Sequence, residues 1–319
     1  MILLTGATGF VGKNFVLSYK AIGAIKVLVR KTSDTSLLRD DNINIVEGRL
    51  EDKENLKRAL KDVDIVLHCA AKTDGRSFYE FHRINTLGTL NLIEAMKEIG
   101  VKRILYLSSQ SAVGSNPNCT PFNEDISARP VSFYGMTKKM AEDAIKKSGL
   151  EYIILRPCSV YGPYDKEILK IIRLLKYGLS PRFGRREKYV NLIYIKDLVD
   201  LMIKIVGNRL FINRIYFVCD GECYSYGEIV NEMAKILKKA RIFDIPIPKS
   251  LGMFFGTLND ALLPEKRRIV GRDKIKELSC DFWLCQNDRL CEELKFRPQY
   301  SLQEGMRETI EWYRRNRWL

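Results

Sequence analysis

Residues 1–12 read Met1-Ile2-Leu3-Leu4-Thr5-Gly6-Ala7-Thr8-Gly9-Phe10-Val11-Gly12, a short apolar run followed by three glycines with the spacing G-x-x-G-x-x-G. A helical pattern over residues 10–21 follows, so this stretch predicts a strand, a tight turn and a helix. In such a unit Gly6 permits the turn, Gly9 lets the backbone approach a pyrophosphate, and Gly12 lets the helix pack closely on the strand. The stretch therefore predicts a dinucleotide site, and the alternative is an ordinary turn that binds nothing.

Length and composition indicate a globular protein. The chain has 319 residues, of which 46% are hydrophobic, enough for one large α/β domain and a smaller appended one. No stretch of about 20 apolar residues is present, so a membrane-spanning helix is not expected. The sequence opens on the strand without a charged and apolar leader, and we therefore expect a cytoplasmic protein.

The cysteines and histidines indicate neither a disulfide framework nor a metal site. Eight cysteines are scattered without a C-x-x-C pair, and free thiols in a reducing compartment are expected. Neither His68 nor His82 has a partner at the spacing of metal ligands. His68 ends an apolar strand, where we expect a packing histidine.

The net charge of +14 is unusual. It would suit nucleic acid, an acidic membrane surface or anionic small molecules. Lysine and arginine are spread through most of the predicted helices, with concentrations at Lys266-Arg267-Arg268 and Arg314-Arg315. No basic motif with interleaved aromatic residues is present, so we expect a solvated basic surface and no nucleic-acid partner.

The first half of the chain alternates strand and helix patterns. Strands are predicted at residues 2–5, 25–30, 43–46, 64–69, 103–108 and 152–155, and helices at 10–21, 53–60, 80–99 and 133–147. This alternation predicts the α/β class, with a doubly wound parallel sheet of the Rossmann type.

The alternation loosens after residue 163. We predict helices at residues 166–177, 197–206, 225–239 and 302–315 and extended segments at 189–194, 215–218 and 245–248. Residues 251–263 are apolar and include Phe254 and Phe255. They would line a substrate channel, touch a membrane or pack, and packing is the expectation. Residues 1–163 with about 187–223 are expected to form the dinucleotide-binding domain, and about 164–186 with 224–319 a smaller substrate-binding domain.

The end of the second predicted strand bears on the cofactor. An acidic residue there would bond the adenosine ribose 2′-hydroxyl, whereas an arginine accommodates a 2′-phosphate. This strand ends in Arg30-Lys31-Thr32-Ser33, without an acid. A guanidinium binds phosphate in a bidentate manner, so the sequence favours NADP over NAD. Arg30 as an ordinary surface residue is the alternative.

Tyr134-Gly135-Met136-Thr137-Lys138 opens the predicted helix 133–147. The spacing of four places Tyr134 and Lys138 on one helix face. A nearby ammonium, together with an oxidised nicotinamide, would lower the pKa of the phenol from about 10. Tyr134 would then exchange a proton with an alcohol or ketone while hydride moves to or from the cofactor. A surface Tyr–Lys pair is the alternative.

Several further motifs follow in order: His68-Cys69-Ala70-Ala71, Asn85 with Gly88-Thr89, Leu107-Ser108-Ser109, and Arg156-Pro157-Cys158-Ser159-Val160-Tyr161-Gly162-Pro163. Together with the glycine turn and the Tyr–Lys pair, they make nearly the whole chain resemble the extended short-chain dehydrogenase/reductase family. That family includes NAD(P)-dependent epimerases, dehydratases, dihydroflavonol-reductase-like enzymes and 3β-hydroxysteroid-dehydrogenase-like enzymes.

The resemblance implies a role for particular residues. Ser109 would donate a hydrogen bond to the substrate oxygen, Tyr134 would be the acid/base, and Lys138 would hold the nicotinamide ribose. Ser108 and Ser111 remain rivals for the serine role, because the strand pattern fixes that register only to a residue or two. The expected cofactor-binding residues are Gly6, Thr8, Gly9, Phe10, Val11, Gly12, Arg30, Leu50, Ala70, Ala71, Asn85, Tyr134, Lys138, Pro157 and Ser159. Homodimers built on the long helices are common in this family, and no metal is expected.

Three departures from the family pattern bear on cofactor and substrate. Arg49 replaces an acid in the adenine pocket, Ser159 stands where many sugar-nucleotide enzymes have asparagine, and residues 188–194 lack an arginine-aspartate pair. With Arg30, the departures at Ser159 and at residues 188–194 favour an NADP(H)-dependent reductase that acts on a small-molecule alcohol or ketone. A nucleotide-sugar epimerase or dehydratase with retained NAD(P) is the alternative, and a non-catalytic nucleic-acid or protein-binding scaffold is a remote third.

Overall fold

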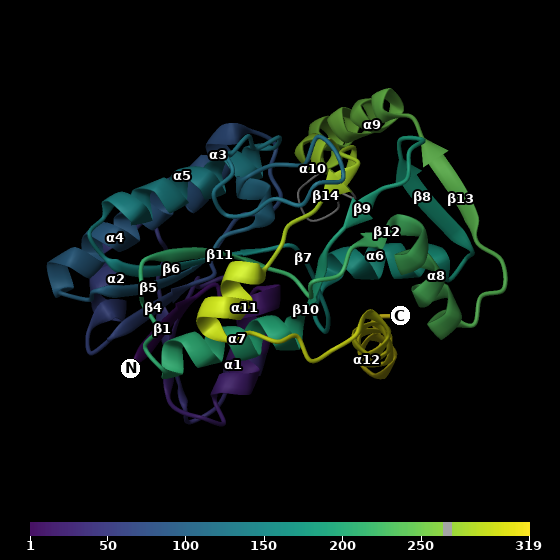
Figure 1. Ribbon diagram of the computed structural model, residues 1–319. Coiled ribbons are helices and arrows are strands. Elements are labelled where there is room, and N and C mark those ends of the chain that lie inside the picture. Colours follow the sequence, from purple (N-terminus) through teal and green to yellow (C-terminus); the bar gives the residue numbers. More distant parts are fainter. Residues whose placement is uncertain (264–269) are drawn as a thin grey trace.

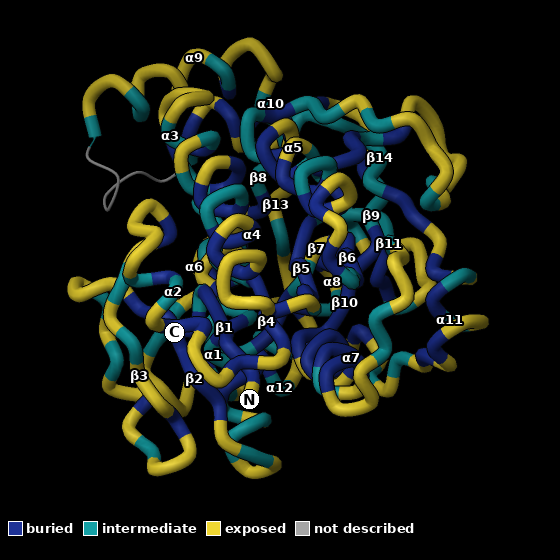
Figure 2. The backbone as a smooth tube through the Cα atoms, turned by 90° about the vertical axis from the view of Figure 1, so that its left-hand side faces the viewer, coloured by how far each residue is buried: buried dark blue, intermediate teal, exposed yellow. Residues whose placement is uncertain are grey.

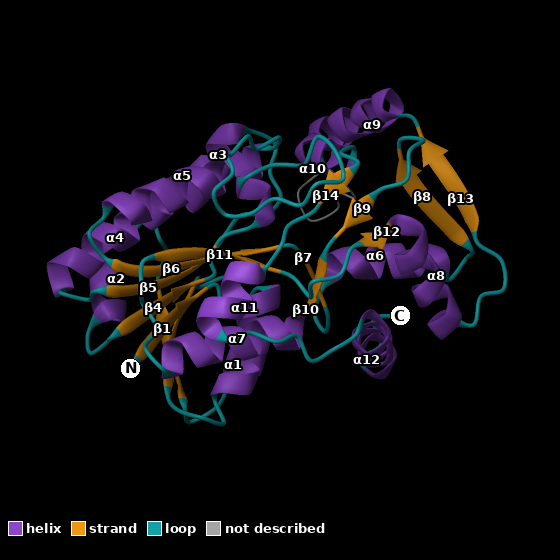
Figure 3. Cartoon of the chain, viewed as in Figure 1, coloured by secondary structure: helices purple, strands orange, loops and turns teal. Residues whose placement is uncertain are grey.

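The centre of the protein is a seven-stranded parallel sheet (Figures 1 and 3). The computed structural model describes residues 1–263 and 270–319. In spatial order the strands are β11 (Arg214–Val218), β6 (Glu151–Pro157), β5 (Arg103–Leu107), β4 (Ile65–His68), β1 (Ile2–Thr5), β2 (Ile25–Val29) and β3 (Ile43–Glu47). The predicted doubly wound sheet is confirmed, and the carboxyl ends of its strands meet at one edge.

Side-chain alternation along the strands divides the interior into two cores. Ile2 and Leu4 of β1 point into one core, and Leu3 points into the other. The helices that pack on the sheet include α1 (Phe10–Tyr19) and α7 (Ile195–Gly207) in the first core, and α2 (Lys53–Leu60), α4 (Gly88–Ile99) and α5 (Phe133–Lys147) in the second. Helices on both faces explain why the central strands are largely apolar.

The predicted helix 80–99 contains a feature that a periodic pattern does not reveal. The segment runs as α3 (Phe78–His82), a π-helical turn (Arg83–Leu87) and then α4. Asn85 lies in the π turn, where its amide bonds Thr137 of α5 and the backbone of Lys72. Such widened turns often occur at functional sites.

The remaining helices and the strands of the smaller sheets follow β6 in the sequence. The strand pairs and triplets are β7 (Ser159–Tyr161) with β10 (Leu192–Tyr194), β8 (Leu179–Phe183) with β13 (Phe243–Ile247), and β12 (Tyr224–Ser225), β9 (Tyr189–Val190) and β14 (Phe282–Trp283). The helices are α6 (Lys166–Leu175), α8 (Tyr226–Leu237), α9 (Lys249–Leu262), α10 (Arg272–Leu278), α11 (Asp288–Leu294) and α12 (Leu302–Arg315), and short 3-10 turns occupy Ser36–Leu38 and Gln110–Ala112. In Figure 1, β8, β13 and α9 lie at the end of the molecule opposite α2.

The expectation that residues 251–263 pack into the protein is wrong for the phenylalanines. Phe254 and Phe255 of α9 are 62% and 51% exposed, and most of α9 is exposed in Figure 2. The helix instead packs through Gly252 and Gly256, whose absent side chains allow Phe183 and Ile275 to approach. The basic run Lys266-Arg267-Arg268 lies outside the described residues.

The structure also bears on the cysteines, on metal-binding groups and on helix length. All eight cysteines are free. Among the described residues, no group of three or more metal-binding side chains could hold a metal ion. No helix in the described part of the chain combines the length and apolar character needed to cross a bilayer.

A buried ion pair fixes α5 against the sheet. The Arg156 guanidinium of β6 donates to both oxygens of Glu142 at 2.9 and 2.7 Å, and the Ser108 hydroxyl donates to the same carboxylate at 2.6 Å. Arg156 and Glu142 are both almost fully buried. Breaking one partner of such a pair is costly because the other charge stays buried without compensation.

We therefore expect Glu142→Gln to lower the free energy of unfolding by about 3 kcal/mol, because it leaves the Arg156 charge buried without a counter-charge. Urea unfolding followed by circular dichroism measures this change. Asp143→Asn is the matched control, since Asp143 pairs with Lys139 and Lys146 on the exposed side of the same helix, and it should cost less than about 1 kcal/mol. Equal losses in the two variants would contradict the role given to the buried pair.

Candidate active site

The glycine turn after β1 brings three pieces of backbone into close contact. Gly6 has a φ of +80°, and a Cβ built on it would lie 2.6 Å from the backbone nitrogen of Ala70, just beyond β4. A Cβ on Gly12 would lie 2.1 Å from the carbonyl oxygen of Gly6. Only glycine fits these two positions, so the turn, the start of α1 and the segment after β4 form one compact unit.

The N-terminus of α1 is open to an anion. The helix begins after Gly9, which is exposed and makes no side-chain cap, and the first turn carries no acidic residue. Thr8, Phe10 and Val11 are half-buried around the same turn. Unpaired N–H groups and the positive end of the helix dipole favour a phosphate at such a position.

Asn14 is a residue of this region that sequence reasoning missed. Its amide donates to the carbonyl oxygens of Phe10 and Pro163, both at 3.0 Å. This side chain ties the first turn of α1 to the loop that follows β7. Its partner is 149 residues away in the sequence, so no local pattern could have indicated the contact.

Arg30 is exposed directly after β2. The nearest acid along the chain, Asp34, accepts a hydrogen bond from the backbone of Ser36 at 3.0 Å. That bond, the Ser36 hydroxyl, and the charges of Lys13 and Arg39 hold the pKa of Asp34 below its usual value. The carboxylate is thus engaged in its own turn and lies among cations, and the end of β2 presents positive charge.

Leu50, Ala70 and Ala71 follow β3 and β4 at the same edge of the sheet. Leu50 is buried and packs on Gly88 of α4, where a Cβ would lie 2.9 Å from that of Leu50. Ala70 and Ala71 are half-buried.

His68 is the packing histidine that the sequence predicts. Its ring nitrogens lie 2.6 Å from the Thr5 hydroxyl and 2.9 Å from the Thr89 hydroxyl. Burial lowers the pKa of His68 to about 3, so the ring is neutral at physiological pH.

Ser109 and Tyr134 meet beyond the end of β5. The Ser109 hydroxyl hydrogen-bonds the phenol of Tyr134, and both side chains are half-buried. The two rival serines are engaged elsewhere. Ser108 is buried and donates to Glu142, and the Ser111 hydroxyl bonds Glu277. Of the three serines, Ser109 is thus the one that contacts the phenol.

Lys138 lies one helical turn from Tyr134 on α5 and is almost completely buried. Its ammonium donates to the carbonyl oxygen of Leu107 at 2.6 Å and lies 4.1 Å above the ring of Tyr106. Burial lowers the pKa of Lys138 to about 7. The lysine therefore carries only part of its charge near neutral pH.

The expectation that this ammonium lowers the pKa of Tyr134 is wrong for the protein without cofactor. Burial and the Glu277 carboxylate raise the pKa of the phenol to about 12, against the opposing effects of Lys274 and Ser109. The physical reason is that desolvation dominates, while the charge of Lys138 is directed at the Leu107 carbonyl. The phenol is consequently protonated in the neutral range.

Helix α10 supplies residues near Tyr134 that sequence reasoning also missed. The Asp273 carboxylate accepts from the backbone nitrogens of Phe133 at 2.8 Å and Tyr134 at 3.2 Å. Glu277 accepts from the Ser132 hydroxyl at 2.7 Å and pairs with Lys274 at 3.0 Å. Burial works to raise the pKa of Glu277, but Lys274 and the two serine hydroxyls hold it below its usual value. These contacts cap the start of α5 and fix the backbone of Tyr134.

The last predicted positions lie where β6 ends and β7 begins. Pro157 is buried and Ser159 is exposed. In the nearby segment 188–194, Asn191 serves a structural purpose. Its amide donates to the carbonyl oxygen of Glu222 at 2.5 Å and accepts from the backbone of Cys285 at 2.6 Å.

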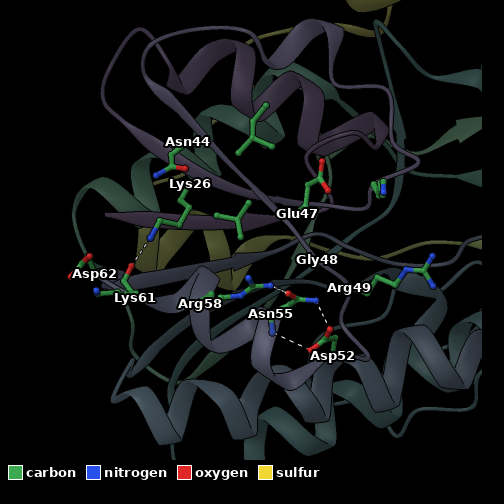
Figure 4. Close-up of a pocket in the computed structure, with 13 residues that line it drawn as sticks. Lys26, Asn44, Glu47, Gly48, Arg49, Asp52, Asn55, Arg58, Lys61 and Asp62 are labelled. Atoms are coloured by element: carbon green, nitrogen blue, oxygen red, sulfur yellow. Dashed lines mark hydrogen bonds between the residues drawn. The ribbon is translucent and has the colours of Figure 1, made fainter.

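A separate surface pocket of about 800 Å³ lies along the edge strand β3 and helix α2 (Figure 4). It reaches Gly48 and Arg49, next to Leu50, but none of Ser109, Tyr134 and Lys138 lines it. The pocket mixes basic and acidic side chains, so the candidate site is defined by the carboxyl edge of the sheet rather than by this cavity.

Comparison with known proteins agrees with the fold and the motif order. A family model described as the NAD-dependent epimerase/dehydratase family matches residues 2–219. The chain is 29% identical to a UDP-glucose 4-epimerase of Vibrio cholerae, over 97% of this chain and 94% of that protein. It is 26% identical to a ceramide reductase of Caulobacter vibrioides, over 100% and 96% of the two chains.

A solved structure shares the whole fold. The dTDP-glucose 4,6-dehydratase of Bacillus anthracis, in complex with NAD, superposes with a TM-score of 0.79 at 21% identity and covers 99% of this chain and 96% of that one. The family match spans the parallel sheet together with Ser109, Tyr134 and Lys138. The chain therefore belongs to the NAD-dependent epimerase/dehydratase family, a group of enzymes within the extended short-chain dehydrogenases/reductases.

Proposed function

We propose that the protein is an NADP(H)-dependent oxidoreductase that interconverts a secondary alcohol and a ketone, with Ser109, Tyr134 and Lys138 as its catalytic residues. The observation that carries the proposal is the hydrogen bond between the Ser109 hydroxyl and the half-buried phenol of Tyr134. It lies at the carboxyl edge of the sheet, where ligands bind in open α/β folds.

The residues present fit a dinucleotide. The glycine turn leaves the N-terminus of α1 without a carboxylate or a capping side chain, as a diphosphate requires. Gly6, Thr8, Gly9, Phe10, Val11 and Gly12 would hold the diphosphate, and Leu50 would pack on the adenine. Ala70, Ala71, Pro157 and Ser159 would line the remainder of the cofactor site. Asn85 is buried and bonded to Thr137 and to the backbone of Lys72, so it would support this region from behind. When bound, the nicotinamide supplies or accepts hydride.

The preference for NADP over NAD rests on the end of β2. Arg30 is exposed there, and Asp34, the nearest acid along the chain, is bonded within its own turn. The guanidinium would pair with a 2′-phosphate, which a carboxylate at this position would repel. The dehydratase of Bacillus anthracis is an NAD complex, so Arg30 would set this chain apart from it.

Side chains of this protein can transfer the proton that the reaction needs. In the reductive direction Ser109 would donate a hydrogen bond to the ketone oxygen and Tyr134, protonated at neutral pH, would deliver the proton to it. In the oxidative direction the phenolate would take the proton from the alcohol. Lys138 would hold the nicotinamide ribose and stabilise that phenolate, and Asp273 of α10 would keep the phenol in position through its bonds to the backbone.

A nucleotide-sugar epimerase or dehydratase with retained cofactor is the second candidate, favoured by the 29% identity to the Vibrio cholerae epimerase. Two observations count against this candidate. The side-chain amide of Asn191 already makes hydrogen bonds within the protein, and the segment 188–194 contains no arginine that could bind a diphosphate. A purified protein that turns over UDP- or dTDP-sugars without consuming external NADPH would establish this candidate instead. A non-catalytic scaffold would not need the Ser109–Tyr134 contact.

Replacing Tyr134 with Phe tests the proton donor. Turnover should fall about 100-fold or more while the affinity for NADPH stays nearly unchanged, because only the proton-transferring oxygen is lost. Steady-state kinetics and NADPH fluorescence titration measure the two quantities. Tyr177→Phe is the control, since Tyr177 is exposed on the surface. Near-normal turnover of the Tyr134 variant would mean that another group carries the proton.

Replacing Arg30 with Asp tests the cofactor preference. The dissociation constant for NADPH should rise by about tenfold or more, because a charge-assisted phosphate contact is replaced by repulsion. That for NADH should change little. Arg241→Asp, a charge reversal on another exposed residue, controls for the change in net charge. Equal losses for NADPH and NADH would show that Arg30 does not contact the 2′-phosphate.

The pH dependence should differ between the two directions. Burial raises the pKa of Tyr134 to about 12, so the proton-donating form prevails near neutrality. At saturating NADPH, kcat/KM for the ketone should therefore not rise between about pH 6 and pH 9. At saturating NADP⁺, kcat/KM for the alcohol should rise with pH by up to about tenfold per pH unit, because it needs the phenolate. A ketone profile that rises with pH would count against Tyr134 as the proton donor.

A further inference from the structure

Helix α9 presents an apolar face to solvent. Leu251, Phe254, Phe255, Leu258 and Leu262 are between 42% and 70% exposed. On a helix of 3.6 residues per turn these five side chains fall within a sector about 100° wide. A surface helix of a soluble protein ordinarily turns such a sector inward.

The inward face of α9 is made of glycine instead. A Cβ on Gly252 would lie 2.7 Å from the ring of Phe183, and one on Gly256 would lie 2.5 Å from Ile275. The helix is therefore held tightly against β8 and α10 by its smallest residues. Its apolar face cannot turn inward without losing that contact, so its exposure is a fixed feature of the fold.

The elements next to α9 carry further exposed apolar side chains. Phe243 and Ile245 of β13, which directly precedes the helix, are also exposed. At the other end Arg76 donates to the carbonyl oxygen of Leu263 at 2.6 Å, which brings α3 and its exposed Tyr79 alongside. Figure 2 shows α9 above α3 at one extremity of the molecule. A group of exposed apolar side chains on one helix face, such as that of α9, marks an interaction site.

Cations gather at the start of α9, and the exposed carboxylate of Asp244 on β13 pairs with Arg182 at 2.7 Å. Along α9 the exposed positions include Lys249 and no acidic residue, and Asp260 is half-buried, where it accepts from the backbone of Arg272 at 2.9 Å. A pocket at the start of the helix is lined by Arg185, Arg186 and Lys249, with Asp281 as its one acid.

We propose that α9 is an interfacial helix that docks the protein on an anionic phospholipid bilayer. Its apolar face would enter the boundary between headgroups and acyl chains, and Arg185, Arg186 and Lys249 would contact lipid phosphates. Amphipathic helices with phenylalanine and leucine on one face and flanking cations bind membranes in this way.

Charge argues for a bilayer over a second copy of the chain. Each chain carries a net charge of +14, so charge repulsion opposes the approach of a second copy through this face. A surface of anionic lipids complements both the apolar face and the cations.

Co-sedimentation of the full chain with lipid vesicles tests the proposal, and it needs no enzymatic activity. The vesicles are phosphatidylcholine with and without phosphatidylglycerol. The protein should bind the anionic vesicles, and the binding should weaken with added salt. The double variant Phe254→Ser/Phe255→Ser should lose about tenfold or more of this affinity. Arg185→Gln/Arg186→Gln should lose a similar factor on anionic vesicles and nothing on neutral ones, at about 1 kcal/mol per cation.

The matched control is Tyr177→Ser/Ile212→Ser, which removes two exposed apolar side chains elsewhere and should bind vesicles as the parent does. Thermal unfolding checks that each variant is folded. Absence of vesicle binding by the parent, or unchanged binding by the phenylalanine variant, would overturn the proposal. Sedimentation velocity tests for a dimer. If the parent forms a dimer that Phe254→Ser/Phe255→Ser abolishes, and does not bind vesicles, the partner of α9 is a second copy of the chain. That result would also overturn the proposal.

Discussion

The arrangement of the protein depends on how closely the backbone after β1 approaches the backbone after β4. A side-chain carbon on Gly6 would lie 2.6 Å from the nitrogen of Ala70, and one on Gly12 would lie 2.1 Å from the oxygen of Gly6. Any other residue would push α1 away from the sheet edge or distort the turn. With glycine, the helix N-terminus, the ends of the strands and the segment at Ala70 converge on one small volume. That convergence is what makes the edge suitable for a dinucleotide.

The site also requires that α5 is held in a fixed position, so that Tyr134 and Lys138 reach the same edge of the sheet. Three independent contacts achieve this: the buried pair of Glu142 with Arg156, the bond from Lys138 to the Leu107 carbonyl, and the cap that Asp273 of α10 places on the backbone of Tyr134. The same helix connects the candidate active site with the exposed face of α9, because α10 also packs against Gly256 of α9. The apolar helix face and the phenol thus share one neighbouring element.

Much of this was predictable from the sequence because it depends on local patterns. The strand 2–5 and the helices 53–60 and 133–147 form at the predicted residues, and the order of the motifs indicated the family before any geometry was known. What could not be predicted depends on contacts between distant residues. Asp273 caps a helix 140 residues earlier in the chain, the raised pKa of Tyr134 follows from its burial in the fold, and the outward turn of Phe254 follows from the packing of two glycines.

The measurement that tests the account most directly is a crystal structure of the protein grown with NADP⁺. The account predicts the diphosphate at Gly9 and the N-terminus of α1, the 2′-phosphate against Arg30, and the nicotinamide ring beside the hydroxyls of Ser109 and Tyr134. A nicotinamide ring that lies remote from Tyr134, or a diphosphate bound away from the glycine turn, would contradict it.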